Sequence, residues 1–290
     1  RLLMPGDVDG PRAVLWLGFG CNQDGDICWQ RRDAPEPPAP VFARWLDELV
    51  AAGARSLIVS GGEPTLRDDL VALIRRAKAA DVHVVLETNA IRLVDDGLRH
   101  ALRDAGLDAV SASLHGHDAA TSAAITRTPG SHAQTLAGVE ACLRDAIPTG
   151  IHCVVEARNA HALTEHAALI ARRFPGVRRV SYSVPTRYLD EARYRRSFAP
   201  LDTVRPQLTA ATRLLRAANI ETRVLGMSGF PLCATDEPVP EREVSAGERE
   251  GHTYASACDA CALRPRCVGV VPMYLDAWGE RGLTPRRHTP

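Results

Sequence analysis

The feature of this 290-residue sequence that most constrains its fold is an alternation of short apolar segments with longer amphipathic segments. The amphipathic segments have apolar residues at helical spacing, whereas the apolar segments have the length of buried strands. Such a pattern predicts an α/β fold, with a parallel sheet that is covered by helices on both faces or closed into a barrel. We count six strand and helix units. The predicted strands are residues 14–19, 56–60, 83–87, 109–114, 151–156 and 179–184, and the predicted helices between them are residues 41–52, 67–80, 92–105, 133–145 and 162–173.

The segments that follow the predicted strands are rich in glycine and polar residues. In parallel α/β folds the ligand lies beyond the carboxyl ends of the strands. We therefore expect the functional residues in these segments, which are residues 20–23, 61–64, 88–90, 115–118, 158–159 and 185–187.

Composition excludes several classes of protein. The 35 basic and 35 acidic side chains balance, so nucleic acid and anionic membranes are not expected partners. The sequence has neither a long apolar span nor the apolar centre of a secretory signal, which predicts a cytoplasmic protein. After Pro200 the rhythm changes: a predicted helix over residues 203–218 leads into a strand-like segment, residues 221–225, and then into a polar stretch. We therefore predict two units, residues 1–200 and residues 201–290.

Eight cysteines in a chain expected in the cytoplasm favour metal or redox chemistry over disulfides. Cys258 and Cys261 are two residues apart, Cys267 follows, and Cys233 can supply a fourth thiolate. Four thiolates complete a structural zinc site or hold an iron–sulfur cluster, and spacing alone leaves both open. The other four are Cys142 and Cys153, which we expect in the core, and Cys21 and Cys28 near the N-terminus.

Cys21 and Cys28, together with Gly61-Gly62-Glu63-Pro64 after the second predicted strand, resemble the radical SAM superfamily. Its members carry three cysteines after the first barrel strand, and these hold a four-iron cluster that binds S-adenosylmethionine. The resemblance implies a partial (β/α)6 TIM-like barrel over about the first 190 residues. It also implies S-adenosylmethionine as cofactor and its reductive cleavage to a deoxyadenosyl radical.

The resemblance assigns roles to further residues. It places Gly61, Gly62, Glu63 and Pro64 at the methionyl amino group of S-adenosylmethionine. The end of the chain resembles a small twitch-like extension of the SPASM/twitch type, because Val271 stands where the full SPASM form has a further cysteine. The implied cofactor-binding residues besides the motif are Ile27, Thr88, Asn89 and Ser113, and the implied ligands of an auxiliary 4Fe-4S cluster are Cys233, Cys258, Cys261 and Cys267.

The chain departs from the family motif at Gly25, where the second of the three cysteines belongs. Three explanations are open at this point. Asp24 or Asp26 could supply an oxygen ligand, the substitution could inactivate the protein, or the fold could use its S-adenosylmethionine pocket without a primary cluster. We favour an altered primary cluster site, without an aspartate ligand, over one in which an aspartate replaces the missing cysteine.

The resemblance implies an S-adenosylmethionine-dependent enzyme that modifies a peptide or a small natural product. A radical mechanism would need an electron donor such as a flavodoxin or ferredoxin. The alternatives are a cluster-free transferase that moves a methyl or alkyl group, and a catalytically silent relative that binds S-adenosylmethionine. We also single out Arg158 and Arg187 as candidates to bind a carboxylate, and His115, His117 and His152 as candidates for proton transfer.

Overall fold

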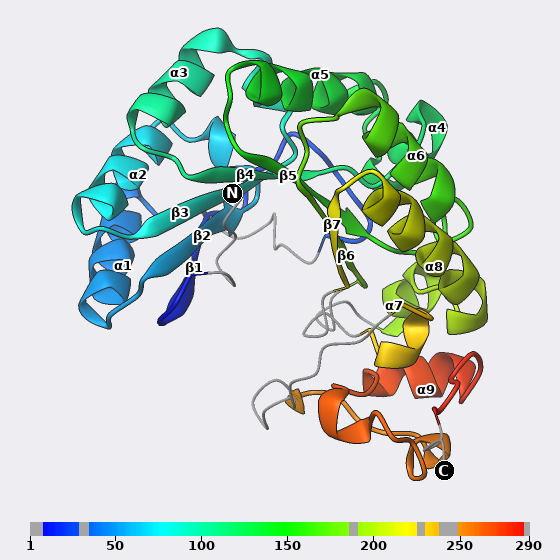
Figure 1. The fold of residues 1–290 in the computed structure, drawn as a ribbon. Helices are drawn as coiled ribbons and strands as arrows, with labels where there is room; N and C mark the ends of the chain where they lie inside the picture. The colour runs from blue at the N-terminus through cyan, green and yellow to red at the C-terminus, as the bar shows by residue number, and fades with distance from the viewer. Residues whose placement is uncertain (1–7, 29–34, 186–190, 225–229, 238–248, 287–290) are drawn as a thin grey trace.

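The computed structural model describes residues 8–28, 35–185, 191–224, 230–237 and 249–286, and its centre is a parallel β-sheet. The sheet has seven strands in the order β1 to β7, so each strand pairs with its neighbour in sequence (Figure 1). This arrangement confirms the α/β fold and the open, barrel-like sheet. The strands are β1 (Arg12–Leu17), β2 (Ser56–Gly61), β3 (His83–Thr88), β4 (Ala109–Ser113), β5 (Thr149–Val154), β6 (Arg179–Ser183) and β7 (Glu221–Val224).

Helices lie along the outer, convex face of the sheet (Figure 1). Among the described residues, no helix has both the length and the apolar character needed to cross a bilayer. The α-helices are α1 (Ala39–Ala51), α2 (Leu70–Ala79), α3 (Asp96–Asp104), α4 (Ala119–Thr126), α5 (Ser131–Arg144), α6 (Leu163–Arg173), α7 (Glu191–Ser197), α8 (Leu201–Ala217) and α9 (Pro272–Trp278).

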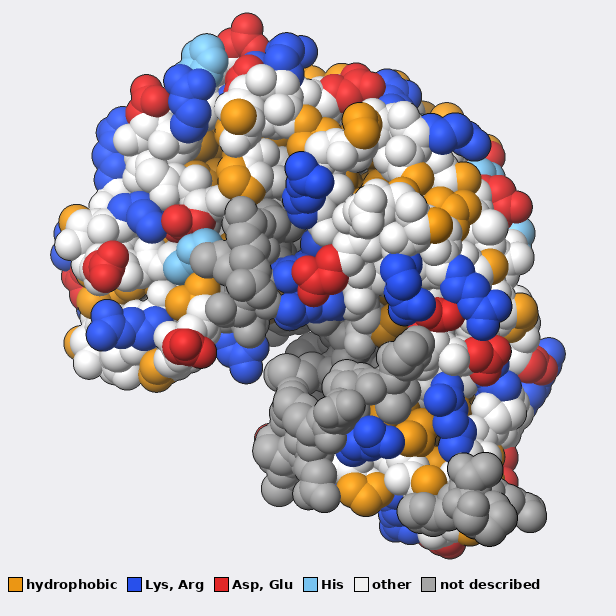
Figure 2. Space-filling model, in the orientation of Figure 1, with side chains coloured by type: hydrophobic (Ala, Val, Ile, Leu, Met, Phe, Trp, Pro, Cys, Tyr) orange, Lys and Arg blue, Asp and Glu red, His pale blue; other side chains and the backbone are white. Residues whose placement is uncertain are grey.

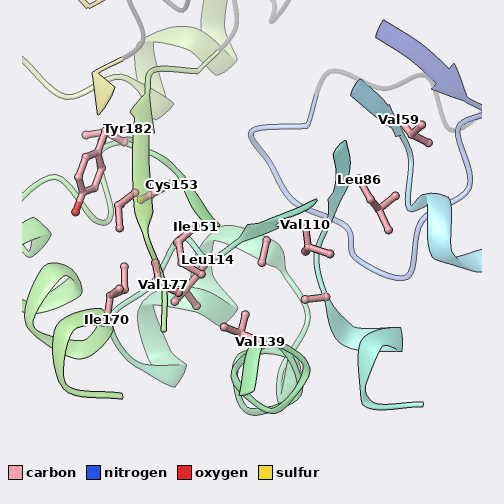
Figure 3. Packing of buried hydrophobic residues seen from close by; sticks show 14 of the residues in the cluster. Val59, Leu86, Val110, Leu114, Val139, Ile151, Cys153, Ile170, Val177 and Tyr182 are labelled. Atoms are coloured by element: carbon pink, nitrogen blue, oxygen red, sulfur yellow. The ribbon is translucent and has the colours of Figure 1, made fainter. Parts of the chain in front are cut away.

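Alternate residues of the strands point to opposite faces, which separates the apolar core from a polar concave face. Val110, Ile151 and Tyr182 belong to the core that packs against the helices (Figure 3). On the opposite face of β5 and β6, His152 Nε2 lies 2.8 Å from Ser183 Oγ. The same face also carries the fully buried Val85 and Ala109, so its polar side chains lie beside a small apolar cluster.

The structure differs from the sequence-based prediction at three elements. The prediction missed α4, whose small residues AATSAAIT give no clear apolar stripe, and it missed the short helix α7. The strand count is seven rather than six, because β7 pairs in parallel with β6. The sheet therefore continues past residue 200, where the sequence places the end of the barrel unit.

The C-terminal part of the chain packs below β7 and α8 (Figure 1). Short 3-10 helices at Leu232–Ala234, Ser256–Cys258 and Arg264–Arg266 precede α9. Phe198 after α7 contacts Tyr274 of α9 edge to face, with 5.2 Å between the ring centroids. The hydroxyl of Tyr274 accepts a hydrogen bond from the backbone N–H of Leu201, at 3.1 Å. These contacts fix the small C-terminal element against the barrel.

We predict that Gly138→Ala destabilises the fold. A Cβ at this position in α5 would lie 2.0 Å from the carbonyl oxygen of Ala90, so the helix must move away from the loop after β3. Overpacking of this kind costs about 1–3 kcal/mol. Gly97→Ala in α3 is the matched control, because its nearest atom is a side-chain oxygen of Asp95 at 3.2 Å. Urea denaturation should give a lower free energy of unfolding for Gly138→Ala only, and equal values for both variants would contradict the prediction.

Candidate functional site

The loop after β1 crosses the carboxyl end of the sheet and is fixed at both of its ends (Figure 1, blue). Near β2, the carbonyl oxygen of Gly20 accepts a hydrogen bond from Glu63 N–H at 2.7 Å. Near α4, the N–H of Asp24 donates to the Thr126 carbonyl at 3.1 Å, and that of Asp26 donates to the Ile125 carbonyl at 3.2 Å. The loop that carries Cys21 and Cys28 is thus held where parallel sheets bind ligands.

The two glycines of the Gly-Gly-Glu-Pro motif are explained by the close approach of this loop. Gly61 has a φ of +141°, a conformation that favours glycine, and its Cβ would lie 2.8 Å from the backbone nitrogen of Leu17. A Cβ on Gly62 would lie 2.1 Å from the carbonyl oxygen of Gly20. Both residues therefore allow β1 and β2 to bring their following loops together.

The carboxylate of Glu63 ties together the ends of β2 and β3. Its Oε1 accepts hydrogen bonds from Thr65 N–H at 3.0 Å, from Thr65 Oγ1 at 2.5 Å and from Thr88 Oγ1 at 2.6 Å. Its Oε2 accepts one from Asn89 N–H at 2.7 Å. Glu63 is only 2% exposed, and burial raises its pKa while these hydrogen bonds oppose the rise. Pro64 begins the 3-10 helix that places Thr65.

Asn89 extends this hydrogen-bond network to the loop after β1 that carries Cys21 and Cys28, called the cysteine loop from here on. Its Nδ2 donates to Oδ1 of Asn22 at 2.6 Å, next to Cys21. Thr88 and Asn89 are buried, whereas Ile27 and Ser113 are half-buried. The structure therefore brings the expected cofactor-binding residues to one end of the sheet and gives Glu63, Thr88 and Asn89 scaffolding contacts. Asn22 was missed by the sequence analysis, since an asparagine after a cysteine carries no specific signal.

Cys21 and Cys28 are half-buried and lie at the two ends of the loop. The N–H of Gln23 donates to Cys21 Sγ at 3.4 Å, and that of Cys28 donates to the carbonyl of Gly25 at 3.1 Å. A Cβ at Gly25 would lie 3.3 Å from the carbonyl oxygen of Ile125, so a cysteine fits there after a small shift. The loop as it stands supplies two thiolates, one fewer than the family motif, so its residues do not complete the three-thiolate site of a primary cluster.

The carboxylates that flank Gly25 are already engaged by arginines. Asp24 Oδ2 lies 3.5 Å from Arg127, and the two oxygens of Asp26 lie 3.3 Å from Arg127 and from Arg158. Burial would raise the pKa of Asp26, but the hydrogen bonds and charges of Arg158 and Arg127 outweigh it and lower that pKa. Ligation of iron by either aspartate would require these pairs to break, so the geometry disfavours the aspartate-ligand explanation.

The four C-terminal cysteines are brought into one neighbourhood. Burial raises the pKa of Cys233, and the charges of Cys267 and Cys258 raise it further. Burial likewise raises the pKa of Cys258, with smaller contributions from Cys267 and Cys261. Such mutual effects require short distances. Among the residues that the structure describes, no three Cys, His, Asp or Glu side chains converge in the geometry of a single metal ion.

Cys267 has the surroundings of a thiolate ligand. The backbone N–H groups of Leu232 and Gly269 donate to its Sγ at 3.4 Å and 3.3 Å. Bonds of this type orient and tune metal-bound sulfur. Gly269 has a φ of +88°, and its Cβ would lie 2.3 Å from the carbonyl oxygen of Thr253. Cys233, Cys258, Cys261 and Cys267 therefore have the donor chemistry of a thiolate-bound centre, but within the described residues their side chains do not converge on the position of a single metal ion.

The two central cysteines are confirmed as core residues. Cys142 and Cys153 are fully buried, and burial raises the pKa of Cys142 to about 12 and that of Cys153 further. A thiol of this kind stays protonated and is a poor metal ligand.

Two of the three histidine candidates near the barrel mouth, His115 and His152, are held neutral by burial. The Val154 N–H donates to His115 Nδ1 at 3.2 Å, and burial, helped by His152 and His166, lowers the pKa of His115 to about 3. Burial also lowers the pKa of His152. His117 Nε2 lies 3.3 Å from a carboxylate oxygen of Asp118. His152, on the concave face beside Ser183, is the best placed of the three to exchange a proton with a bound ligand.

Of the two arginines singled out to bind a ligand carboxylate, the structure describes only Arg158. Arg158 bonds the buried Glu156 through Nε, at 2.8 Å, and the carbonyl of Ala124 through one of its terminal nitrogens, at 2.7 Å. It therefore positions the loop around Asp26 rather than presenting a vacant fork to a ligand carboxylate. Arg187 lies outside the described residues. The role of Arg127, in a left-handed turn at the end of α4, has no signal in the sequence.

A comparison with protein families matches residues 17–170 to the model described as Radical SAM superfamily. The match covers more than half of the chain and includes β2 to β5 with both loops described above. The chain therefore belongs to the radical SAM superfamily, and it is an enzyme of that superfamily. Membership implies S-adenosylmethionine and a 4Fe-4S cluster as cofactors.

Individual relatives match part of the chain. An AdoMet-dependent heme synthase of Methanosarcina barkeri is 31% identical over 190 residues, which is 64% of this chain and 54% of that protein. A PqqA peptide cyclase of Rhodopseudomonas palustris is 33% identical over 134 residues, 46% of this chain and 35% of that protein. The match thus spans about half or less of these relatives' length.

A solved structure extends the similarity over nearly the whole chain. Native anSMEcpe with bound AdoMet and Cp18Cys peptide superposes with a TM-score of 0.60 at 16% identity, covering 94% of this chain and 91% of that one. At this identity the likeness concerns the fold alone. The similarity confirms the partial barrel, and its coverage shows that the shared fold extends into the C-terminal element.

We predict that His166→Gln removes part of the acid sensitivity of the fold. His166 Nε2 lies 2.9 Å from the Leu114 carbonyl, and burial lowers its pKa from 6.5 to about 4. A lowered pKa gives stability that is present above pH 6.5 and lost as the pH falls toward 4. Between pH 7.5 and 5.5 the loss is about 1.4 kcal/mol.

The measurement is the free energy of unfolding against pH, with the exposed His161→Gln as control. His166→Gln should be less stable than wild type at pH 7.5 and should lose less stability on acidification. An unchanged pH slope would show that His166 is not the group that titrates.

Proposed function

We propose that this protein is an S-adenosylmethionine-dependent enzyme of the radical SAM superfamily that modifies a peptide or small natural-product substrate. Its primary cluster motif is degenerate at Gly25, and its C-terminal element holds an auxiliary 4Fe-4S cluster. The observation that carries the proposal is the joint placement of two sites. The loop with Cys21 and Cys28 lies against Gly62 and Glu63, and four further cysteines gather in the C-terminal element packed on the same barrel.

The comparisons support the substrate class. One relative is named as a cyclase of the PqqA peptide, and a solved structure of similar fold holds both AdoMet and a peptide. The polar concave face, with His152 and Ser183 in contact, suits the amides of a peptide better than it suits a large apolar ligand.

In this proposal S-adenosylmethionine would supply a deoxyadenosyl radical where three thiolates hold the primary cluster, as in Gly25→Cys, and the chain's own residues position the reactants. Glu63, Thr88 and Asn89 hold the carboxyl ends of β2 and β3 at a fixed distance from the cysteine loop. Ile27 and Ser113, which are half-buried, are placed to contact the adenine and the polar part of S-adenosylmethionine. His152 on the concave face is the residue that would accept or return a substrate proton.

We propose two units. The barrel unit comprises residues 1–200 together with α8 and β7, and the twitch-like unit begins after β7 and includes Cys233. A flavodoxin or ferredoxin would supply the electron. The relatives named above are a synthase and a cyclase, which gives no support to the cluster-free transferase or to a silent binding protein.

We predict that Gly25→Cys raises both the iron content and the cleavage of S-adenosylmethionine. The wild-type chain should hold about four irons after anaerobic reconstitution, at its C-terminal cysteines, and the variant should hold about eight. The reason is that a third thiolate completes the site of Cys21 and Cys28, where the atom nearest to an added Cβ is the Ile125 carbonyl oxygen at 3.3 Å. Iron and sulfide assays, electron paramagnetic resonance and mass spectrometry of deoxyadenosine, with dithionite as reductant, check both effects.

Gly25→Ala is the matched control, because it adds the Cβ without a ligand and should leave the iron content at the wild-type value. Cys258→Ala with Cys261→Ala should remove the irons of the wild-type chain. Eight irons without deoxyadenosine in Gly25→Cys would overturn the radical function. Zinc in place of iron in the wild-type chain would overturn the auxiliary cluster.

A further inference from the structure

Glu36 lies between the cysteine loop and α1, and its carboxylate accepts two backbone hydrogen bonds at the end of β1. Its Oε1 lies 2.6 Å from the backbone nitrogen of Phe19 and 2.5 Å from that of Gly20. Gly20 directly precedes Cys21. Hydrogen bonds to a carboxylate are roughly twice as strong as those between neutral groups. The side chain of Glu36 therefore links the chain that follows both cysteines to the residue before the first of them.

The backbone of Gly20 is held by two partners. Its N–H donates to the side chain of Glu36, and its carbonyl oxygen accepts the backbone N–H of Glu63 at 2.7 Å. A residue other than proline has one such donor and one such acceptor, so both backbone groups of Gly20 are engaged. One partner follows the cysteine loop and the other follows β2. The residue before Cys21 is thus fixed from two separate segments of the chain.

The end of β1 is shaped around the carboxylate of Glu36. Gly18 has a φ of +73°, a conformation that favours glycine. A Cβ at this position would lie 1.9 Å from Oε2 of Glu36, so a larger residue would displace the carboxylate. A Cβ on Gly20 would lie 3.3 Å from Oε1. The two glycines therefore leave the space that the Glu36 side chain fills.

Arg67 lies behind Glu36 and is itself fixed. Its Nη1 lies 3.8 Å from Oε2 of Glu36, while its Nε and Nη2 each donate to Asp69 at 2.8 Å. Its guanidinium carbon lies over the ring of Phe42 in α1, 4.2 Å from the ring centroid. The side chain of Arg67 is 18% exposed, against 44% for Glu36. Arg67 therefore presents a preorganised positive charge to the more mobile type of contact, an exposed carboxylate.

The carboxylate of Glu36 does not serve the helix that follows it. Acidic side chains before a helix often cap its N-terminus. The N-cap residue of α1 is Pro38, which makes no side-chain hydrogen bond. The Oε1 atom of Glu36 is used at the end of β1 instead. The role of Glu36 thus concerns the start of the cysteine loop.

We propose that Glu36 is a positioning residue of the cofactor site. Its carboxylate fixes the backbone before Cys21, and thereby the place at which Cys21 presents its thiol beside the Gly-Gly-Glu-Pro segment. Cys28 is held differently, since its N–H donates to the Gly25 carbonyl within the loop at 3.1 Å. An exposed ion pair such as that with Arg67 adds little, so the backbone hydrogen bonds carry the effect. The inference rests on the proposed function, in which Cys21 belongs to the cofactor site.

The test is the rate at which iodoacetamide alkylates Cys21 and Cys28 in the full chain before reconstitution, under reducing conditions. Peptide mass spectrometry reads the two rates separately. Glu36→Ala should raise the rate at Cys21 relative to that at Cys28 about tenfold, because local opening at Gly20 becomes easier. Glu36→Gln keeps an oxygen acceptor for both N–H groups, so its ratio should stay within about twofold of the wild-type value.

The loss of one negative charge needs its own control, because acidic and basic side chains are interspersed over the part of the surface where α1 lies (Figure 2). Glu48→Ala supplies it. Glu48 forms an exposed ion pair with Arg44 in α1, at 3.7 Å, and its removal should leave the ratio of the two rates unchanged.

An unchanged ratio in Glu36→Ala would overturn the proposal, and so would a rise in both rates together, which is the sign of a general loss of stability. An equal rise in Glu36→Gln would attribute the effect to the charge next to the thiol and would overturn it as well. The measurement needs no cofactor. Failure of the proposed function would be seen separately, as absence of deoxyadenosine from Gly25→Cys with the alkylation result unchanged.

Discussion

The buried carboxylate of Glu63 is the interaction on which the candidate site depends. It accepts four hydrogen bonds, from Thr65, Thr88 and Asn89, with no basic side chain among the donors. A buried carboxylate is costly unless its oxygens are hydrogen-bonded, so the ends of β2 and β3 are fixed relative to each other. The same residue donates its backbone N–H to Gly20. One side chain and one backbone group thus join three parts of the chain at the carboxyl end of the sheet.

The cysteine loop is stabilised differently at its two ends. Near β2 it is held by close backbone contacts that Gly61 and Gly62 permit, whereas near α4 it is held by backbone hydrogen bonds and by Arg127 and Arg158 around its aspartates. The first kind of contact is independent of ionic strength, and exposed ion pairs of the second kind are screened by salt. The half of the loop that contains Gly25 is therefore the half whose geometry depends on charge.

Much of the fold could be predicted because the apolar pattern of the strands reports burial directly. Six strands, five helices and the core positions of Cys142 and Cys153 followed from this pattern. Helix α4 could not be predicted, since its small residues carry little periodic contrast. The seventh strand was recognised as extended chain, but pairing with β6 is a long-range property that local pattern does not contain.

The candidate site, too, could be predicted only in part from the sequence. Motif spacing brought Cys21, Cys28 and the Gly-Gly-Glu-Pro segment together correctly, because spacing reflects which loops meet. Spacing did not show that Glu63, Thr88 and Asn89 would be saturated by contacts within the chain. Nor could it show that Arg127, Arg158 and Arg193 surround Asp26, because these residues come from three separate segments.

The arginines around Asp26 also bear on what the loss of a cysteine at position 25 means. If an aspartate had replaced the missing thiolate as a ligand, its carboxylate would have to be available to a metal. Asp26 is instead held by two guanidinium groups, and the one farther along the chain, Arg158, is itself anchored on the buried Glu156. The aspartates are thus structural members of the loop, and the chemistry of the first site is decided by Gly25 alone.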